Sequence, residues 1–324
     1  MSIRRLLHGS SLRSPSNPSA ASIASQFLAT HASLPPHQGT RFLDPNSLQR
    51  FSAALSRSEL ALPEPPPQWT PLPPCYHLAY FLPAQVEEEL GADGTDTMFN
   101  PPTPYTRRMW AGGELEWIHT GLKDIGDWRK RGLRVGTLVN EMTKLVSAEG
   151  KETKSGEEMV VVGVRKEYES QDDGLMLVDK RNWLFRPEIT QPQNPVPKPT
   201  VVPFPDGKHV RDFLQTPVSL FRFSAVTFNA HKIHYNREWC REVEGHRDLV
   251  VHGPLNLVNM VNFWRDIHPK KELAIPRRVK YRATGPLYAN EPYRLILDEE
   301  VDMVTKARFV DSYGSVAMVG QIEA

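Results

Sequence analysis

The chain has 324 residues, of which 40% are apolar, and this is enough material for two domains that each bury a core. Its 39 basic and 38 acidic side chains nearly cancel, so the overall charge gives no reason to expect a nucleic-acid-binding or membrane-surface protein. The two cysteines, Cys75 and Cys240, are far apart, which argues against a disulfide framework or a cysteine-based zinc site. No stretch approaches the ~18 consecutive apolar residues of a membrane-spanning helix.

Residues 1–40 have a composition of their own. They contain Arg4, Arg5 and Arg13 together with many serines, and the first acidic residue of the chain is Asp44. A basic, serine-rich and acid-poor start is typical of a mitochondrial transit peptide, and a plain disordered tail is the alternative. We therefore expect residues 1–40 to direct the protein to the mitochondrial matrix and to lie outside the fold.

Prolines divide the rest of the chain, because two of their clusters interrupt otherwise regular sequence. The first cluster, residues 63–74, follows a helix predicted at residues 46–56. The second, residues 187–206, predicts an extended linker between an N-terminal domain of residues 41–186 and a C-terminal domain of residues 207–324. An antiparallel meander is predicted in the N-terminal domain, with strands at residues 107–118, 133–147, 158–168 and 175–185.

The C-terminal domain is predicted to place helices among its strands. Asn236 can cap a short helix at residues 237–243, and Pro254 suits the first turn of a second helix, residues 255–264, whose apolar residues recur at helical spacing. Strands are predicted at residues 218–228, 277–283, 293–304 and 307–321. An apolar helix enclosed by an antiparallel sheet is the arrangement of an α+β hot-dog fold.

Residues 223–254, FSAVTFNAHKIHYNREWCREVEGHRDLVVHGP, hold most of the chemically active side chains. This run resembles the active-site segment of the MaoC-like, R-specific enoyl-thioester hydratase superfamily. His234 matches the superfamily's catalytic histidine, and residues 251–253 match its Val-His-Gly element. Asn229 stands where the superfamily has an Asp, and His231 stands where it has an Asn. Both differences match the double-hot-dog branch, which includes mitochondrial type 2 hydroxyacyl-thioester dehydratase and mesaconyl-CoA hydratase.

A second run, residues 104–117 with the sequence PYTRRMWAGGELEW, resembles a signature in the N-terminal hot dog of the same branch. The resemblance therefore spans both halves, from about residue 82 to the end of the chain. It implies an α+β double hot-dog fold with two antiparallel sheets, each wrapping a central helix, of which the N-terminal unit is the one that can be degenerate.

The resemblance implies a cofactor-free hydro-lyase that reversibly dehydrates (3R)-3-hydroxyacyl thioesters to trans-2-enoyl thioesters. The acyl group would be carried by acyl carrier protein in mitochondrial fatty-acid synthesis. Two alternatives stay open. One is a hydratase of a small unsaturated acyl-CoA such as mesaconyl-CoA, or a dehydratase of a biosynthetic pathway; the other is a noncatalytic protein that binds acyl thioesters. Because two fused hot dogs already pair with each other, a monomer and a homodimer are both compatible with the sequence.

The chemistry of the reaction points to the same residues. One group must handle a proton near the β-carbon, and one donor must hold the thioester oxygen as enolate charge develops. His234, with an ordinary pKa of ~6.5, can do the first near neutral pH. The backbone N–H of Gly253, at the start of a helix, can do the second, since the helix dipole makes that end positive. Asn229 cannot titrate, but its amide can hold a water molecule against the histidine.

The other polar residues of the two runs are expected beside the substrate in supporting roles. His231 is predicted as a structural hydrogen-bonding residue, and His252 is expected to orient the start of the second helix. Arg107 and Arg108 could engage phosphates of a pantetheine carrier, and a solvated strand face is the alternative. Although His231 and His234 stand three residues apart, no third ligand of recognisable spacing follows them, so no metal site is expected.

Missing motifs disfavour several other classes of enzyme. The sequence has no Gly-rich phosphate loop, Walker sequence or GxSxG element, which disfavours redox-cofactor enzymes, nucleotide hydrolases and serine hydrolases. Cys240 falls in a predicted helix without a histidine partner nearby in the sequence, so it is expected in the core and not as a nucleophile.

Overall fold

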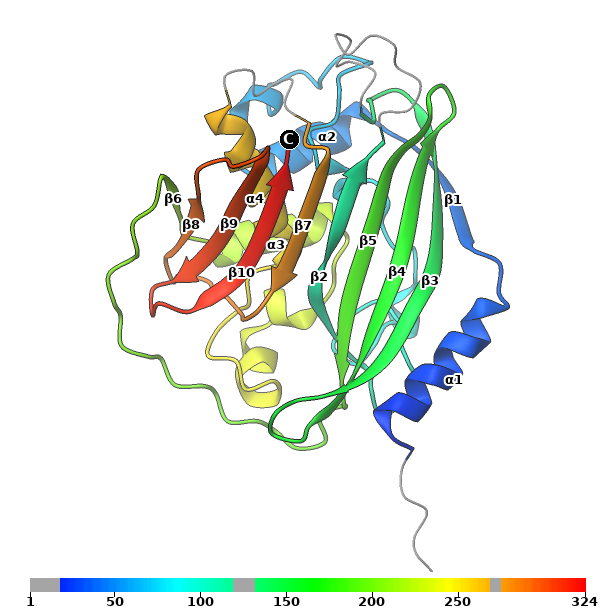
Figure 1. Cartoon of the computed structure of the whole chain (residues 1–324), viewed down its shortest axis with the longest axis vertical. Helices are drawn as coiled ribbons and strands as arrows, with labels where there is room; N and C mark the ends of the chain where they lie inside the picture. Colours follow the sequence, from blue (N-terminus) through cyan, green and yellow to red (C-terminus); the bar gives the residue numbers. More distant parts are fainter. Residues whose placement is uncertain (1–17, 119–131, 269–274) are drawn as a thin grey trace, which may run out of the picture.

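The described chain forms one continuous antiparallel sheet of ten strands, with helices packed against it (Figure 1). The structure is a computed structural model and describes residues 18–118, 132–268 and 275–324. The strands lie in the order β1-β3-β4-β5-β2-β7-β10-β9-β8-β6. Five strands of the N-terminal half therefore adjoin five strands of the C-terminal half.

The bounds of the elements follow the chain order. The strands are β1 (His37–Phe42), β2 (Arg107–Trp117), β3 (Leu138–Glu152), β4 (Glu158–Ser170), β5 (Gly174–Arg186), β6 (His209–Phe213), β7 (Arg278–Ala283), β8 (Tyr293–Leu297), β9 (Val304–Asp311) and β10 (Val316–Glu323). The α-helices are α1 (Ala20–Ala32), α2 (Pro45–Ala54), α3 (Pro217–Val226) and α4 (Gly253–Ile267). Shorter helical turns are η1 (Ser58–Leu60), η2 (Tyr76–Ala79), η3 (Glu87–Glu89), η5 (Lys232–His234) and the π-helix η6 (Trp239–Val243).

The two halves are joined where β2 pairs with β7, in a register that sets Gly112 opposite Arg282. On its other side β2 pairs with β5. Gly113 allows these backbones to approach, because a Cβ at this position would lie 2.1 Å from the carbonyl oxygen of Lys180. The predicted double hot-dog is therefore present, with its two sheets continuing edge to edge into a single sheet.

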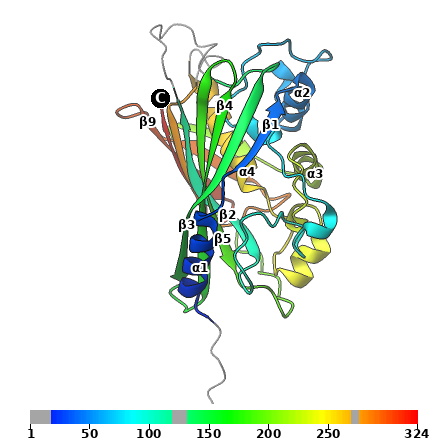
Figure 2. The same cartoon turned by 90° about the vertical axis from the view of Figure 1, so that its right-hand side faces the viewer.

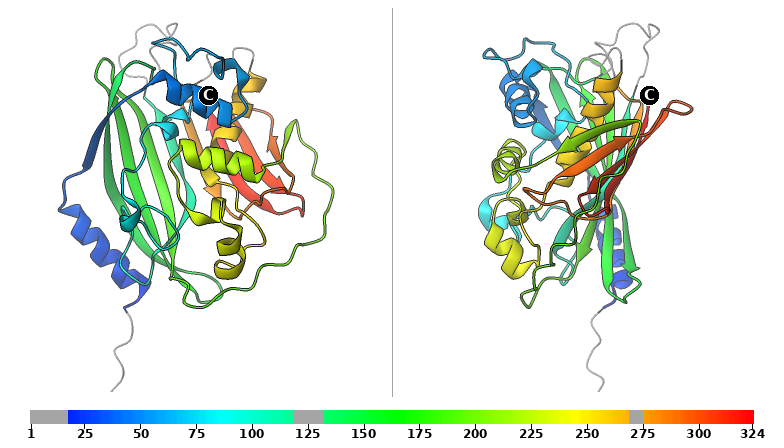
Figure 3. Two further views of the ribbon diagram at one scale, coloured as in Figure 1. Left: turned by 180° about the vertical axis from the view of Figure 1, so that it is seen from behind. Right: turned by 90° about the vertical axis from the view of Figure 1, so that its left-hand side faces the viewer.

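The α4 helix is the central helix of the C-terminal half, and it confirms the prediction for residues 255–264. Every residue from Leu255 to Trp264 is buried, including the polar Asn256, Asn259 and Asn262, as expected for a central helix enclosed on all sides. Pro254 lies in the first turn, where the missing N–H of proline costs no helical hydrogen bond. The α2, α3 and α4 helices lie on the same side of the sheet (Figures 2 and 3). The N-terminal half contributes only the ten-residue α2 there, against fifteen residues in α4.

Residues 20–42 belong to the folded body, which corrects the expectation that residues 1–40 lie outside it. The α1 helix is capped by the side chain of Ser19, and it packs Ile23 and Phe27 into an apolar cluster with β3 and β4. The β1 strand pairs along β3. A lack of acids describes only charge, whereas apolar residues at helical spacing can still be buried. The buried residues of α1 are Ala20, Ile23, Ala24 and Phe27.

The strand predicted at residues 218–228 is wrong, because this segment forms α3. Thr216 caps the helix through a reciprocal pair of hydrogen bonds with Ser219, and such a capping box fixes a helix start. Only one face of α3 is buried, through Leu220 and Phe223, and their spacing is helical. The β-branched and aromatic composition of the segment favoured a strand, but the cap and the one-sided burial favour a helix.

Two further predictions for the C-terminal half are corrected. The single strand predicted at residues 307–321 is a hairpin of β9 and β10, whose turn contains Gly314 in a left-handed conformation (φ +82°). The side chain of Asp311 accepts two backbone N–H groups in this turn, which stabilises the reversal. The strand predicted at residues 293–304 ends at Leu297, as β8, and the unpredicted β6 pairs along it.

The remaining predictions hold within a few residues. The strands β2, β3, β4, β5 and β7 and the helix α2 are confirmed, and the helix predicted at residues 237–243 is the shorter π-helix η6. The proline-rich residues 187–206 form no helix or strand and run around the outside of the molecule from β5 toward β6 (Figure 1). None of the helices described is both long and apolar enough to cross a membrane.

Candidate active site

The turn after α3 begins the candidate active site. The backbone N–H of Asn229 donates to the carbonyl of Ser224, and the Asn229 side-chain oxygen accepts the backbone N–H of His231 at 3.0 Å. Such an Asx turn fixes the direction of the chain entering η5. The oxygen of Asn229 is therefore engaged by the backbone, and its Nδ2 is the group left for the predicted role of holding water.

His234, at the end of η5, is buried and held in one tautomer. Its Nδ1 lies 2.7 Å from the carbonyl oxygen of Val250, and because a carbonyl only accepts, Nδ1 carries the hydrogen. Nε2 then has a free lone pair, and none of the hydrogen bonds between the residues that the structure describes uses it. Burial, and next the neighbouring His231, lower the pKa of His234 to about 3. The ring is thus neutral at neutral pH and presents one basic nitrogen.

His252 stacks against the ring of His234. The two imidazoles stack with their centroids 3.6 Å apart and their planes at 19°. Nε2 of His252 lies 2.9 Å from Oγ of Ser224, and burial lowers the pKa of His252 well below its ordinary value. His252 is also the residue that precedes α4, as its N-cap. The stacking therefore sets His234 directly beside the start of α4, in agreement with the orienting role expected for His252.

Gly253 begins α4, whose unpaired first-turn N–H groups and dipole create a positive end. An ideal Cβ at position 253 would lie 2.8 Å from Cδ1 of Trp110, a residue of β2 in the N-terminal half. Trp110 in turn stacks on Tyr281, with centroids 5.8 Å apart. Glycine is therefore required by close packing across the two halves, in addition to the open backbone that the oxyanion role needs.

His231 lies at the edge of His234, with ring centroids 5.4 Å apart and planes at 80°. Burial, followed by the effects of Glu244 and neighbouring cations, sets its pKa at about 4, below the ordinary value. The structure brings Asp93 and Glu244 to this ring, so that one ligand atom of each of the three residues lies within 4.8 Å of the others. The sequence showed no third ligand of recognisable spacing after His231 and His234, whereas the structure groups His231 with Asp93 of the N-terminal half and with Glu244, and His234 is not part of this group.

The two arginines of β2 are occupied within the protein. Arg108 is buried, donates to Asp96 and Asn100, and lies 4.4 Å over the ring of Trp183. Arg107 forms an ion pair with the buried carboxylate of Glu244. Two expectations for Arg108 are thereby corrected, namely contact with a carrier phosphate and a place on a solvated strand face. Its guanidinium is buried and binds groups within the protein.

Cys240 has the surroundings of a core residue, as predicted. Its Sγ donates to the carbonyl of Ile233 at 3.1 Å, and burial raises the pKa of the thiol to about 12. A thiol with so high a pKa is not a nucleophile near neutral pH. Sequence reasoning missed Ser224, Trp110 and Asp93 as parts of the site. Trp110 lies in the second resembling run, but Asp93 stands in a turn that carries no recognisable signal.

The chain is similar in sequence to known proteins. The family model described as hydroxyacyl-thioester dehydratase type 2 matches residues 75–289. Mesaconyl-C(4)-CoA hydratase from Chloroflexus aurantiacus is 33% identical over 239 residues, which are 72% of this chain and 78% of that protein. The mitochondrial hydroxyacyl-thioester dehydratase type 2 of Schizosaccharomyces pombe is 28% identical over 246 residues, 71% of this chain and 79% of that protein.

Solved structures share the fold. The crystal structure of a MaoC-like dehydratase from Phytophthora capsici superposes with a TM-score of 0.65 at 13% identity, covering 92% of this chain and 98% of that one. A conserved hypothetical protein from Mycobacterium tuberculosis, described as a double hot-dog fold, superposes with a TM-score of 0.50 at 12% identity, covering 90% and 96%. At these identities the likeness establishes the fold alone.

The fold is that of the MaoC-like double hot-dog proteins, and the family match places the chain in the hydro-lyase class. Within that class the family is settled by sequence, since the matching family model covers most of the chain. The chain belongs to the hydroxyacyl-thioester dehydratase type 2 family.

Proposed function

We propose that this protein reversibly dehydrates (3R)-3-hydroxyacyl thioesters to trans-2-enoyl thioesters, with His234 as the proton-transferring residue. The observation that carries the proposal is the fixed tautomer of His234. Its Nδ1–H is bound by the Val250 carbonyl, and its ring is stacked on His252 at the start of α4. A neutral base is thereby held next to a helix terminus that stabilises negative charge.

In the dehydration direction, Nε2 of His234 removes the proton from the α-carbon of the thioester. The electron pair of that C–H bond moves toward the thioester oxygen, and the Gly253 N–H holds the resulting enolate. As the enolate collapses, the α–β double bond forms and the β C–O bond breaks. The departing hydroxyl takes the proton back from Nε2 of His234 and leaves as water, so the enzyme ends in its starting protonation state.

The proposed carrier is acyl carrier protein, and the proposed pathway is mitochondrial fatty-acid synthesis. Support comes from the family match and from two yeast relatives that are named as mitochondrial type 2 dehydratases. The acid-free start of the chain, with Arg4, Arg5 and Arg13, supports import into mitochondria. Because α1 and β1 are folded onto the sheet, we propose that the removed segment ends before Ala20 and not at residue 40.

Hydration of a small unsaturated acyl-CoA is the second candidate function. It is favoured by one observation, the 33% identity to a mesaconyl-C(4)-CoA hydratase, which exceeds the 28% identity to the Schizosaccharomyces pombe dehydratase. The proposed catalytic residues serve both reactions, since hydration is the reverse of the same proton transfers. The two functions differ in the acyl group and its carrier.

A direct assay separates these functions. The purified protein would be given crotonyl-CoA, mesaconyl-CoA and a 3-hydroxyacyl carrier protein, with product measured by mass spectrometry. We expect the highest kcat/KM with the carrier-protein substrate. A higher value with mesaconyl-CoA would favour the second candidate, and binding without turnover of any of the three would contradict both. Sequencing the N-terminus of protein recovered from mitochondria tests the proposed import and its boundary.

A further inference from the structure

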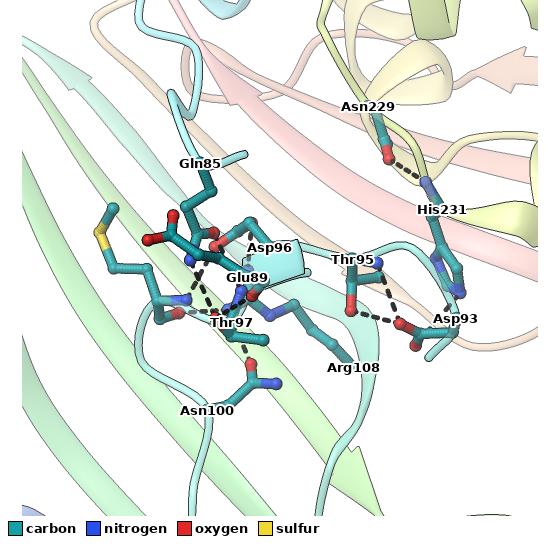
Figure 4. A network of polar contacts seen from close by, with 11 residues as sticks. Gln85, Glu89, Asp93, Thr95, Asp96, Thr97, Asn100, Arg108, Asn229 and His231 are labelled. Atoms are coloured by element: carbon teal, nitrogen blue, oxygen red, sulfur yellow. Dashed lines mark hydrogen bonds and ion pairs between the residues drawn. The ribbon is translucent and has the colours of Figure 1, made fainter. Parts of the chain in front are cut away.

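We propose that Asp93, a residue of the N-terminal half, is a positioning residue of the active site that orients the His231 ring and fixes its tautomer. Its Oδ2 lies 3.7 Å from Nε2 of His231 (Figure 4), and the side chains of His231 and Asp93 are 12% and 9% exposed. The effect of Asp93 on catalysis rests on the proposed function. The position of Asp93 beside His231 is independent of that function, because it follows from contacts between the two halves.

The loop that carries Asp93 is clamped to the active-site segment by backbone contacts. The backbone N–H of Lys232 donates to the Asp93 carbonyl at 2.8 Å, and the Lys232 ammonium donates to the Ala92 carbonyl at 2.7 Å. Gly94 adopts a left-handed conformation, and a Cβ there would lie 2.1 Å from the Ala230 carbonyl oxygen. The carboxylate therefore faces His231 because the loop has little freedom to place it elsewhere.

The two oxygens of Asp93 have separate tasks. Oδ1 accepts the backbone N–H of Thr95 at 2.9 Å and its hydroxyl at 2.7 Å (Figure 4). Oδ2 is the oxygen directed at His231. At 3.7 Å the contact is longer than a hydrogen bond, and an acceptor oxygen at this place favours the tautomer in which Nε2 of His231 carries the hydrogen. Nδ1 of His231 then keeps its lone pair, giving the site a second oriented acceptor beside His234.

The same cluster has the residue types of a cation site, but its charges favour the positioning role. Glu244 is the third member, and its two oxygens already accept from Arg107 and from the indole N–H of Trp239. A cation bound between Asp93 and His231 would lie close to the Arg107 guanidinium, and like charges at such a distance repel. The carboxylate of Asp93 and the neutral ring of His231 suffer no such repulsion.

The tautomer of His231 provides a test that does not depend on catalysis. Long-range ¹H–¹⁵N spectra of the histidine-labelled protein report which ring nitrogen carries hydrogen, and the His231→Gln variant assigns the signal. We expect the Nε2–H tautomer in the natural protein. In Asp93→Asn the amide oxygen is retained by the two Thr95 donors, so its NH₂ must face the ring, and the tautomer should switch to Nδ1–H. An unchanged His231 signal in Asp93→Asn would overturn the proposal.

A double-mutant cycle tests whether Asp93 acts through His231. Asp93→Asn should lower kcat ~10- to 100-fold with KM little changed, and it should have almost no further effect in a His231→Gln background. The matched control is Asp96→Asn, which removes a carboxylate of the same loop that pairs with Arg108 and leaves both Asp93 and the Lys232 clamp in place. It should lower the thermal midpoint, leave kcat near that of the natural protein, and give additive effects with His231→Gln.

The outcomes separate the proposals. A switched tautomer in a protein that turns over none of the substrates supports the positioning role and contradicts the proposed function. Additive losses in Asp93→Asn and His231→Gln contradict the positioning role and leave the proposed function intact. Loss of turnover on adding a chelator, with recovery on adding back a divalent cation, would make Asp93 a metal ligand and overturn the inference.

Discussion

Both halves of the sheet bury a histidine cluster, and the two clusters are built in opposite ways. In the N-terminal half, Nε2 of His77 lies 3.2 Å from Asp179, and Arg181 lies 2.6 Å from the same carboxylate. Burial alone would raise the pKa of Asp179, but Arg181 and His77 together hold it well below its usual range. Every charge in this cluster is matched by its neighbour.

In the C-terminal half, His234 and His252 are stacked on each other, and among the residues that the structure describes neither has a carboxylate as an ion-pair partner. Their contacts are a carbonyl and a hydroxyl, from Val250 and Ser224. In the first cluster the carboxylate of Asp179 binds both the imidazole of His77 and the guanidinium of Arg181, whereas His234 is bound through Nδ1 and keeps a lone pair on Nε2. The comparison favours a structural role for the first cluster and supports the proposed catalytic role for the second.

The largest expected effect would follow from removing His234. We expect His234→Ala to lower turnover by at least ~10²- to 10⁴-fold, because it removes the group that carries the proton. Asn229→Ala is the comparison variant, and it should lose much less, since the Asn229 oxygen supports a turn. Steady-state kinetics with circular dichroism as a folding check would decide. Turnover near that of the natural protein in folded His234→Ala would break the contrast between the two clusters.

A substitution at Gly253 tests the contact at which the halves meet. Gly253→Val should lower turnover severely, about 10²-fold or more, because the side chain displaces the thioester from the N–H. It should also lower the thermal midpoint, since even a Cβ would lie 2.8 Å from Trp110. Adding Trp110→Leu relieves the crowding, so stability should partly recover while turnover stays low. Recovery of turnover together with stability would reduce Gly253 to a packing role.

Removing the charge of Asp179 from the N-terminal cluster should lower the stability of the protein and leave its turnover nearly unchanged. Asp179→Asn leaves Arg181 buried without its counter-charge, which typically destabilises a protein by about 3–5 kcal/mol. Turnover of the folded fraction should stay within about fivefold of the natural protein. The matched control is Asp212→Asn, which breaks the exposed pair with Arg294 and should change stability by less than about 1 kcal/mol. Urea unfolding of both variants makes the measurement.

The smallest expected effect concerns pH. The pKa of His231 is lowered to about 4 and that of His234 to about 3, while both titrate near 6.5 in the unfolded chain. Between these values the unfolded chain binds more protons, so stability is fully present above pH ~6.5 and falls as pH drops toward 4. Each histidine should account for roughly 2 kcal/mol between pH 6.5 and 5.

Thermal midpoints measured over this pH range, for the natural protein and for His234→Ala, provide the check. The thermal midpoint should fall less steeply with decreasing pH in His234→Ala than in the natural protein, because the variant lacks the contribution of one buried histidine. Equal slopes would show that His234 is not kept neutral by burial.

The sequence by itself determined the elements whose signals are local. Apolar spacing and Pro254 predicted α4, and strand-like runs predicted β2 to β5. These predictions hold because a helix period and a proline at a first turn lie within a few consecutive residues. The roles of His234 and Gly253, which the motif in residues 223–254 suggested, stay predictions.

The tertiary structure alone decided what depends on burial and on contacts between distant residues. The segment of α3 has the composition of a strand, but its cap and its one-sided burial make it a helix. Residues 20–32 have the composition of a transit peptide, yet their apolar face is buried on β3 and β4. Trp110 and Asp93 reach the site only because β2 pairs with β7 and a clamped loop crosses between the halves. Such contacts join residues more than a hundred positions apart, and no local pattern records them.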